Sequence, residues 1–256
     1  IVEIVNEYGA SLIGPNCIGV ITNQYAGVFT HPIENISPNG VDLISGSGAT
    51  IVFIMEAAHK LGISFSNVFS VGNCAQIGIE EVLEYLDNTY KEGVSSPVKL
   101  LYIESIHNPN KLQKHASSLI AKGARIAAIK SGYSQAGSQA ASSHTGAIAT
   151  PDNAVDALFN KCGIIRAYSR SELTNLAAVL SFPKPKGNRM AIITHAGGPA
   201  VMLTDILNSN GIEIPRLSGK RTEELLEKLY PGSQVNNPID FLSTGTAEQL
   251  GHIIDA

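Results

Sequence analysis

The 256-residue sequence contains no tryptophan, only three cysteines and no hydrophobic run long enough to cross a bilayer. A membrane-spanning helix needs about 20 apolar residues, so we expect neither a membrane span nor a membrane partner. Cys17, Cys74 and Cys162 lie far apart and form no CxxC pair, which argues against a disulfide framework and against a structural zinc site. We therefore expect a soluble cytoplasmic protein with no metal site of its own.

Basic blocks are absent as well. The formal net charge is -4 and the positive residues are not clustered, so the sequence gives no indication of a nucleic-acid partner. Residues 1–5 have neither a cationic start nor an initiating methionine, and residues 252–256 stop within a helical pattern. Both ends resemble interior points of a longer chain, and we expect the sequence to be a fragment.

Short apolar runs alternate with segments of helical period from residue 38 to residue 182. The expected strands are residues 41–44, 68–71, 98–103, 126–129 and a short strand that starts at 164. The first helical segment carries an apolar repeat at three and four residues, formed by Ile51, Ile54, Met55 and Ala58. Five such strand–helix units predict an α/β domain with a flavodoxin-like parallel sheet.

The sequence has further parts on both sides of this domain. Residues 1–37 are expected to be the tail of a preceding domain with its connection, and the proline-rich residues 183–188 a linker. From residue 189 to 256 the alternating pattern starts again, with expected strands at 190–193 and 212–214. These strands are too few for a complete sheet, so we expect a second α/β domain that is truncated.

The segment from residue 131 to 150 holds small and polar side chains and almost nothing that could pack into a core. We expect it to be a loop, and long loops in compact domains are often functional. His144 lies between Ser143 and Thr145, where no bulky neighbour covers it, so it is the candidate nucleophile. The alternative is an ordinary surface or hydrogen-bonded histidine, because a single histidine constrains function loosely.

Several polar residues follow expected strands of the first domain: Ser47, Asn73, Glu104 and the segment of His144. Because the carboxyl ends of parallel strands meet at one edge, where ligands bind, we expect these residues to lie together. Glu104 would orient one ring nitrogen of His144 and leave the other as the nucleophile. A salt bridge between Glu104 and Lys130 is an equally open alternative.

Two glycine turns each precede a helix, namely Ser47-Gly48-Ala49 and Ala196-Gly197-Gly198. Unpaired backbone N–H groups and the helix dipole at such a terminus attract an anion, and small residues leave its approach open. Both turns are therefore candidate phosphate sites, which together could cradle one phosphoryl group. The alternative for either turn is that glycine serves the backbone geometry alone.

Eight short motifs run along the chain. They are Gly14-Pro15-Asn16-Cys17-Ile18-Gly19, Leu43-Ile44-Ser45-Gly46-Ser47-Gly48-Ala49, Ser70-Val71-Gly72-Asn73, Tyr102-Ile103-Glu104, Lys130-Ser131-Gly132, Ser143-His144-Thr145-Gly146-Ala147, Ala196-Gly197-Gly198-Pro199 and Asn237-Pro238-Ile239-Asp240. With these motifs in this order, the chain resembles the nucleoside-diphosphate-forming (ADP-forming) acyl-CoA synthetases, relatives of succinyl-CoA synthetase. One such motif is weak evidence, whereas eight in order are specific.

The resemblance implies that His144 is transiently phosphorylated, with Glu104 as its carboxylate partner. The helices that begin near Ser47 and Gly197 would supply their amino ends to the phosphoryl group. Phosphate would attack an acyl-CoA to give acyl phosphate and free CoA, and His144 would carry the phosphoryl group to ADP. A CoA-binding domain would precede residue 1, with residues 14–19 as its trailing edge.

The resemblance also implies the ligands and partners. Coenzyme A or its acyl group would lie near Asn16, Cys17 and Asn73. ADP or ATP, with Mg²⁺, would bind an ATP-grasp domain after residue 256 or on a partner subunit. Acyl-CoA, acyl phosphate and phosphate would be the small-molecule partners. The sequence leaves a homo-oligomer open.

Three positions depart from the family pattern. Gly46 stands where a larger polar residue is usual, His195 replaces a frequent asparagine, and residues 74–77 lack the lysine and aspartate common after Gly-Asn. His195 is either a phosphate-binding group or an incidental change, and residues 74–77 bear on acyl specificity. A non-catalytic module that senses CoA or acyl phosphate is the rival interpretation. A succinyl-CoA synthetase alpha chain is disfavoured because residues 188–256 add a further unit.

Overall fold

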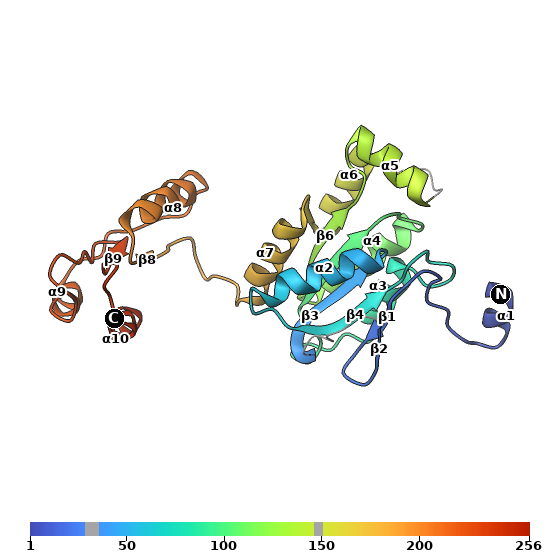
Figure 1. Cartoon of the computed structure of the whole chain (residues 1–256), viewed down its shortest axis with the longest axis horizontal. Coiled ribbons are helices and arrows are strands. Elements are labelled where there is room, and N and C mark those ends of the chain that lie inside the picture. The colour runs from blue at the N-terminus through green and yellow to red at the C-terminus, as the bar shows by residue number, and fades with distance from the viewer. Residues whose placement is uncertain (29–35, 146–150) are drawn as a thin grey trace. The chain divides into compact units, whose positions relative to one another are not determined.

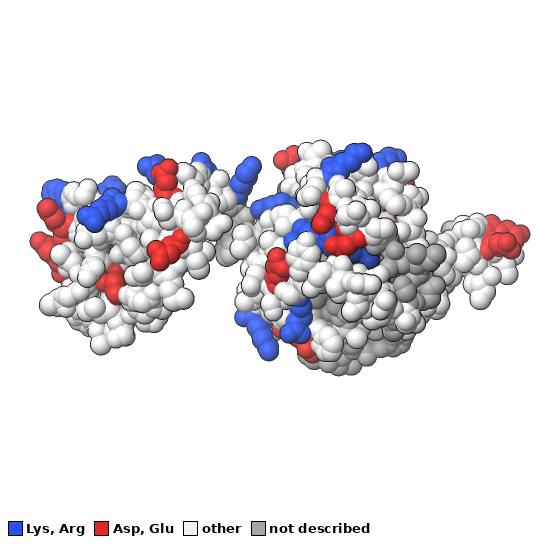
Figure 2. Space-filling model, turned by 90° about the horizontal axis from the view of Figure 1, so that it is seen from above, with Lys and Arg blue, Asp and Glu red and all other residues white. Residues whose placement is uncertain are grey.

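The computed structural model describes residues 1–28, 36–145 and 151–256, without the side chains of Val28, Ser142, His144 and Thr145. The chain forms two compact units, Ile1–Pro183 and Lys184–Ala256, and each is described by itself (Figure 1). On the face seen in Figure 2, acidic and basic side chains are interspersed over both units. None of the described helices is long and apolar enough to span a membrane.

The first unit is built on a seven-stranded sheet in the order β2-β1-β4-β3-β5-β6-β7. The strands are β1 (Gly19–Ile21), β2 (Ala26–Val28), β3 (Ile36–Ser45), β4 (Phe65–Ser70), β5 (Val98–Ile103), β6 (Arg125–Lys130) and β7 (Ile165–Ala167). Five neighbouring strands, β4, β3, β5, β6 and β7, are all parallel. Numbered by their sequence within this set, they follow the flavodoxin-like order 2-1-3-4-5 along the sheet. The predicted α/β flavodoxin-like fold is therefore confirmed.

Helices cover both faces of this sheet (Figure 1). They are α2 (Gly48–His59), α3 (Ile79–Asn88), α4 (Pro109–Ala121), α5 (Gln135–Thr145), α6 (Asp152–Cys162) and α7 (Arg170–Ser181), with α1 (Val2–Glu7) near the first residue. Buried residues of α2 and α7 share one core cluster, and those of α3, α4 and α6 share another. Adjacent residues of β5, such as Leu100 and Leu101, belong to different clusters, which explains its continuous apolar run.

The expected loop over residues 131–150 is wrong in part, because residues 135–145 form helix α5. This segment lacks a large apolar stripe, but its alanines and glutamines favour helix. Close packing supports it as well, since a Cβ added at Gly132 would lie 3.2 Å from the Cβ of Ala141. The loop predicted at residues 146–150 lies outside the described residues.

Two strands from the segment 1–37 belong to the sheet of the first unit. Strands β1 and β2 pair with each other, and β1 pairs antiparallel with β4, with Val20 opposite Phe69. This part of the segment therefore extends the flavodoxin-like sheet at its edge. Whether the residues before it belong to a CoA-binding domain remains a prediction.

The second unit contains a short parallel pair, β8 (Ile193–Thr194) and β9 (Ile239–Asp240), with helices α8 (Gly197–Ser209), α9 (Lys220–Leu226) and α10 (Ala247–Asp255). The strand expected at residues 212–214 is wrong, because that segment makes a single bridge between Arg189 and Glu213. The small core of the second unit consists of Leu225, Leu229, Val235, Ile239, Phe241 and Ile253. Helix α8 contributes only Ala200 to the buried residues.

Candidate functional site

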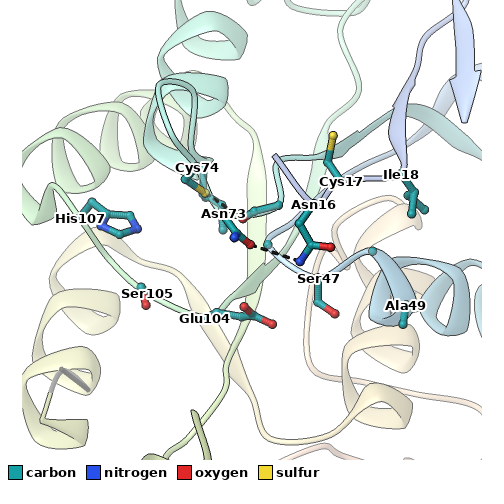
Figure 3. Close-up of a pocket in the computed structure, with 14 residues that line it drawn as sticks. Asn16, Cys17, Ile18, Ser47, Ala49, Asn73, Cys74, Glu104, Ser105 and His107 are labelled. Atoms are coloured by element: carbon teal, nitrogen blue, oxygen red, sulfur yellow. Dashed lines mark hydrogen bonds between the residues drawn. The ribbon is translucent and has the colours of Figure 1, made fainter. Parts of the chain in front are cut away.

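A pocket of about 430 Å³ opens where β3, β4 and β5 end (Figure 3). Its lining consists of Asn16, Cys17, Ile18, Gly46, Ser47, Gly48, Ala49, Gly72, Asn73, Cys74, Ile79, Glu104, Ser105 and His107. Seven of the residues predicted from the sequence are among them: Asn16, Cys17, Ser47, Gly48, Ala49, Asn73 and Glu104. The pocket lies at the edge of the sheet where ligands of open parallel sheets bind.

Helix α2 points its amino end at this pocket. The hydroxyl of Ser45 accepts a hydrogen bond from the backbone N–H of Ser47 (3.0 Å) and donates one to the Ser47 carbonyl (2.8 Å). The Ser47 side chain caps the helix by accepting from the N–H of Thr50 (3.4 Å). Within the described part of the chain, the N–H groups of Gly48 and Ala49 have no acceptor. They are available to an anion.

Glu104 brings a carboxylate to the same space. Figure 3 shows its side chain in the pocket, on the side of Ser47. A Cβ added at Gly46 would lie 3.6 Å from the Cγ of Glu104, at ordinary van der Waals distance, so Gly46 and the Glu104 side chain are neighbours in the pocket. The alternative partner, Lys130, is buried and donates to the carbonyl of Ser131 (2.7 Å). The ion pairs of the described residues do not include one between Lys130 and Glu104.

Burial lowers the pKa of Lys130, and Arg166 adds to this effect, while Asp152 and Glu104 oppose it. Lys130 on β6 pairs with Ile103 on β5, and Ile103 is the residue directly before Glu104. Its charge therefore acts on the pocket through the electrostatic field and not through a direct contact.

The Asn16 and Asn73 side chains meet across the pocket, where the Asn16 amide donates to the Asn73 carbonyl oxygen (3.3 Å) (Figure 3). The two residues come from segments 57 positions apart. A ladder of backbone hydrogen bonds joins these segments: Asn73 N–H to Pro15 O (2.9 Å), Ala75 N–H to Gly14 O (2.9 Å) and Ile77 N–H to Leu12 O (3.2 Å). The segment before β1 is therefore a wall of the site.

This ladder depends on Gly72. Its φ is +58°, a region that favours glycine, and a Cβ there would lie 2.2 Å from the Pro15 carbonyl oxygen. Any side chain at this position would push the two segments apart.

The other seven lining residues were not predicted as site residues: Ile18, Gly46, Gly72, Cys74, Ile79, Ser105 and His107. Ser105 and His107 follow Glu104 in the loop after β5, so the position of that loop was the available signal. The loop is anchored by Glu80, which is 2% exposed and accepts from the N–H groups of His107 (2.8 Å) and Asn108 (3.0 Å).

Cys74 is a pocket residue that remains a neutral thiol at ordinary pH. Burial is the main cause that raises its pKa to about 11, and the nearby carboxylates of Glu80, Glu81 and Glu104 contribute to this rise. Because the thiolate is the nucleophilic form of cysteine, Cys74 acts as a small neutral side chain here.

The remaining predicted site residues lie elsewhere. His144 belongs to α5, but its side chain is outside the described residues, so its pairing with Glu104 stays a prediction. Ala196, Gly197 and Gly198 form the start of α8 in the second unit. His195 is exposed there, with its ring edge-on to that of Phe241 at a centroid distance of 6.5 Å.

The described residues contain no group of three or more His, Cys, Asp or Glu side chains that could hold a metal ion. The pocket offers backbone N–H groups, amides and hydroxyls around the single carboxylate of Glu104, together with the imidazole of His107 and the thiols of Cys17 and Cys74. Such a set suits a phosphoryl group better than a cation.

Comparisons with known proteins identify relatives of this chain. The succinyl-CoA ligase-like flavodoxin domain matches residues 38–180. The chain is 36% identical to the acetate–CoA ligase [ADP-forming] II subunit alpha of Pyrococcus furiosus, over 97% of this chain and 53% of that protein. It is 34% identical to the acetate–CoA ligase [ADP-forming] I of Archaeoglobus fulgidus, over 98% of this chain and 36% of that protein.

A solved structure is similar over both units. It is the dinucleotide-forming acetyl-coenzyme A synthetase 1 of Ca. Korarchaeum cryptofilum in complex with phosphate and ADP, with a TM-score of 0.80 and 28% identity over 95% of this chain and 52% of that one. The chain thus spans between about a third and a half of the length of these relatives. The resemblance to the ADP-forming acyl-CoA synthetases is confirmed, and the chain belongs to the family of succinyl-CoA ligase-like flavodoxin domains.

Proposed function

We propose that this chain is the phosphoryl-transfer part of an ADP-forming acyl-CoA synthetase. The reaction would interconvert acyl-CoA, ADP and phosphate with a carboxylic acid, CoA and ATP. The observation that carries this proposal is the pocket itself, in which the free N–H groups of Gly48 and Ala49 face the same space as Glu104. The names of the similar ligases support the same reaction.

The first step is attack of a phosphate oxygen on the thioester carbonyl carbon. The carbon–sulfur bond breaks, giving acyl phosphate and the thiol of CoA. The N–H groups at the start of α2 stabilise the phosphate charges. Asn16, Cys17 and Asn73 line the approach and would contact CoA or the acyl group.

In the second step a ring nitrogen of His144 attacks the phosphorus of the acyl phosphate. The bond between phosphorus and the acyl oxygen breaks and the carboxylate leaves. Glu104 would accept a hydrogen bond from the other ring nitrogen, which fixes the tautomer and stabilises the positive ring after attack. The phosphohistidine then passes its phosphoryl group to the terminal phosphate oxygen of ADP.

The nucleotide and Mg²⁺ are assigned to an ATP-grasp domain or partner subunit. The amino end of α8, at Gly197 and Gly198, would serve the phosphohistidine as a second set of N–H donors. We place the enzyme in the cytoplasm, on the evidence of its three separated cysteines, and expect an oligomer.

Intact-mass measurement after incubation with acetyl phosphate tests this proposal. We expect one added phosphoryl group that is stable in base, labile in acid and absent from the His144→Asn variant. His59→Asn is the matched control, because His59 lies at the far end of α2 from Ser47 and should leave labelling unchanged. Full-length protein that turns over normally with His144→Asn would overturn the proposal and favour the non-catalytic sensing module.

A further inference from the structure

Ile18 overhangs the first turn of α2. A Cβ added at Gly48 would lie 2.7 Å from the Cγ2 of Ile18, so the glycine at 48 makes room for this side chain. In Figure 3, Ile18 and Ala49 lie on one side of the Asn16–Asn73 hydrogen bond, whereas Cys74 and His107 lie on the other. Ile18 therefore bounds the part of the pocket that contains the amino end of α2.

The backbone around Ile18 is fixed. Its N–H donates to the hydroxyl of Ser70 (3.2 Å), which is fully buried at the end of β4. The next residue, Gly19, starts β1, which pairs with β4. The side chain also packs against the core cluster beneath α2. The Ile18 side chain is therefore held in place at the wall of the pocket. Because it is β-branched, it has little rotamer freedom to move away from a bound group.

The chemistry of the proposed function brings the acyl group to this wall. In an acyl phosphate the carbonyl carbon is bonded to an oxygen of the phosphoryl group. A phosphoryl group held by the N–H groups of Gly48 and Ala49 therefore leaves the acyl chain within a few ångströms of the same turn. We propose that Ile18 sets the upper size limit of the acyl group that this site accepts, an inference that rests on the proposed function.

The other lining residues decide which larger acyl groups would benefit from added room. Apart from Glu104 and His107, the pocket is lined by neutral or apolar residues, including Ile79. Neither lysine nor arginine is among them. Space gained at Ile18 therefore favours longer uncharged chains and offers no partner to a second carboxylate.

Substrate competition with Ile18→Ala tests the inference. The complete protein, with its nucleotide-binding part, is assayed with acetate, propionate, butyrate and isobutyrate. We expect the ratio of kcat/KM for butyrate to that for acetate to rise about tenfold or more, since a pocket discriminates by about 10- to 200-fold per methylene. Ile18→Val should give a smaller rise in the same direction.

Ile63→Ala is the matched control. Ile63 packs against the same core cluster as Ile18 but does not line the pocket, so it should leave the ratio unchanged. A ratio within twofold of wild type in Ile18→Ala, with normal turnover of acetate, would overturn the inference and leave the proposed function standing. Absence of turnover in the wild type with every acid would overturn both.

Discussion

The two glycine turns share one local design although they lie in different units. In the first, the hydroxyl of Ser45 bridges the N–H (3.0 Å) and carbonyl (2.8 Å) of Ser47. In the second, the hydroxyl of Thr194 bridges the N–H and carbonyl of Ala196, both at 3.0 Å. Each hydroxyl ends a strand, and each bridged residue is the N-cap of the following helix.

A carboxylate from the neighbouring strand accompanies each turn. A Cβ at Gly46 would lie 3.6 Å from the side chain of Glu104, and one at Gly197 would lie 3.2 Å from an oxygen of Asp240. What differs is the surroundings. The first turn sits among five parallel strands and opens into a lined pocket, whereas the second follows a two-stranded pair. Local sequence is enough to build the turn, but the pocket needs the neighbouring strands.

The largest difference between the two turns is expected in kcat, when the carboxylate beside each turn is replaced. Glu104→Gln should lower kcat by about 10²- to 10⁴-fold, because it removes the charge that would stabilise the His144 ring. Asp240→Asn should lower it by no more than about tenfold, since the Asp240 oxygen that accepts from Leu242 N–H (3.0 Å) can be replaced by an amide oxygen. Steady-state assays of the complete protein measure both. An equal loss of kcat in the two variants would contradict different roles for Glu104 and Asp240.

A second effect is expected on stability. Ser45→Ala should lower the free energy of unfolding of the first unit by about 1–3 kcal/mol, because Ser45 is fully buried and its loss leaves the backbone N–H of Ser47 without its acceptor. Thr194→Ala should cost about 0.5–1.5 kcal/mol, since water can reach this half-buried position. Hydrogen exchange at the amides of Ser47 and Ala196 distinguishes the two units. A larger loss at Thr194 would contradict the difference in burial.

A third effect, similar in size to the second, concerns the glycines themselves. Gly48→Ala should cost about 1–3 kcal/mol, because the new methyl group crowds Ile18. Gly198→Ala should change stability by less than about 1 kcal/mol, since nothing lies within 4 Å of its added Cβ. A double-mutant cycle with Ile18→Ala checks the cause by denaturant unfolding. If Ile18→Ala does not reduce the cost of Gly48→Ala, the crowding argument fails.

The parallel sheet and much of its pocket follow from local features of the sequence. The apolar runs predicted β5 at its observed bounds, and the repeat at Ile51, Ile54, Met55 and Ala58 is the buried face of α2. Ser47, Asn73 and Glu104 were predictable because each follows a strand of one parallel sheet.

The features that the sequence did not predict depend on contacts between distant segments. Helix α5 has no apolar stripe to reveal it, and its packing on Gly132 is visible only in three dimensions. Ile18 enters the pocket because residues 12–15 run beside residues 73–77, a pairing that no local pattern encodes.

The backbone ladder at Gly72 has a consequence for how this protein can be rearranged in evolution or in the laboratory. The matched family domain starts at residue 38, yet the segment at residues 12–15 supports one wall of the pocket. A gene fusion or domain swap cut at residue 38 would transfer the sheet and leave that wall behind. The segment that is needed to form the pocket therefore reaches back at least to Leu12, beyond the first residue of the matched family domain.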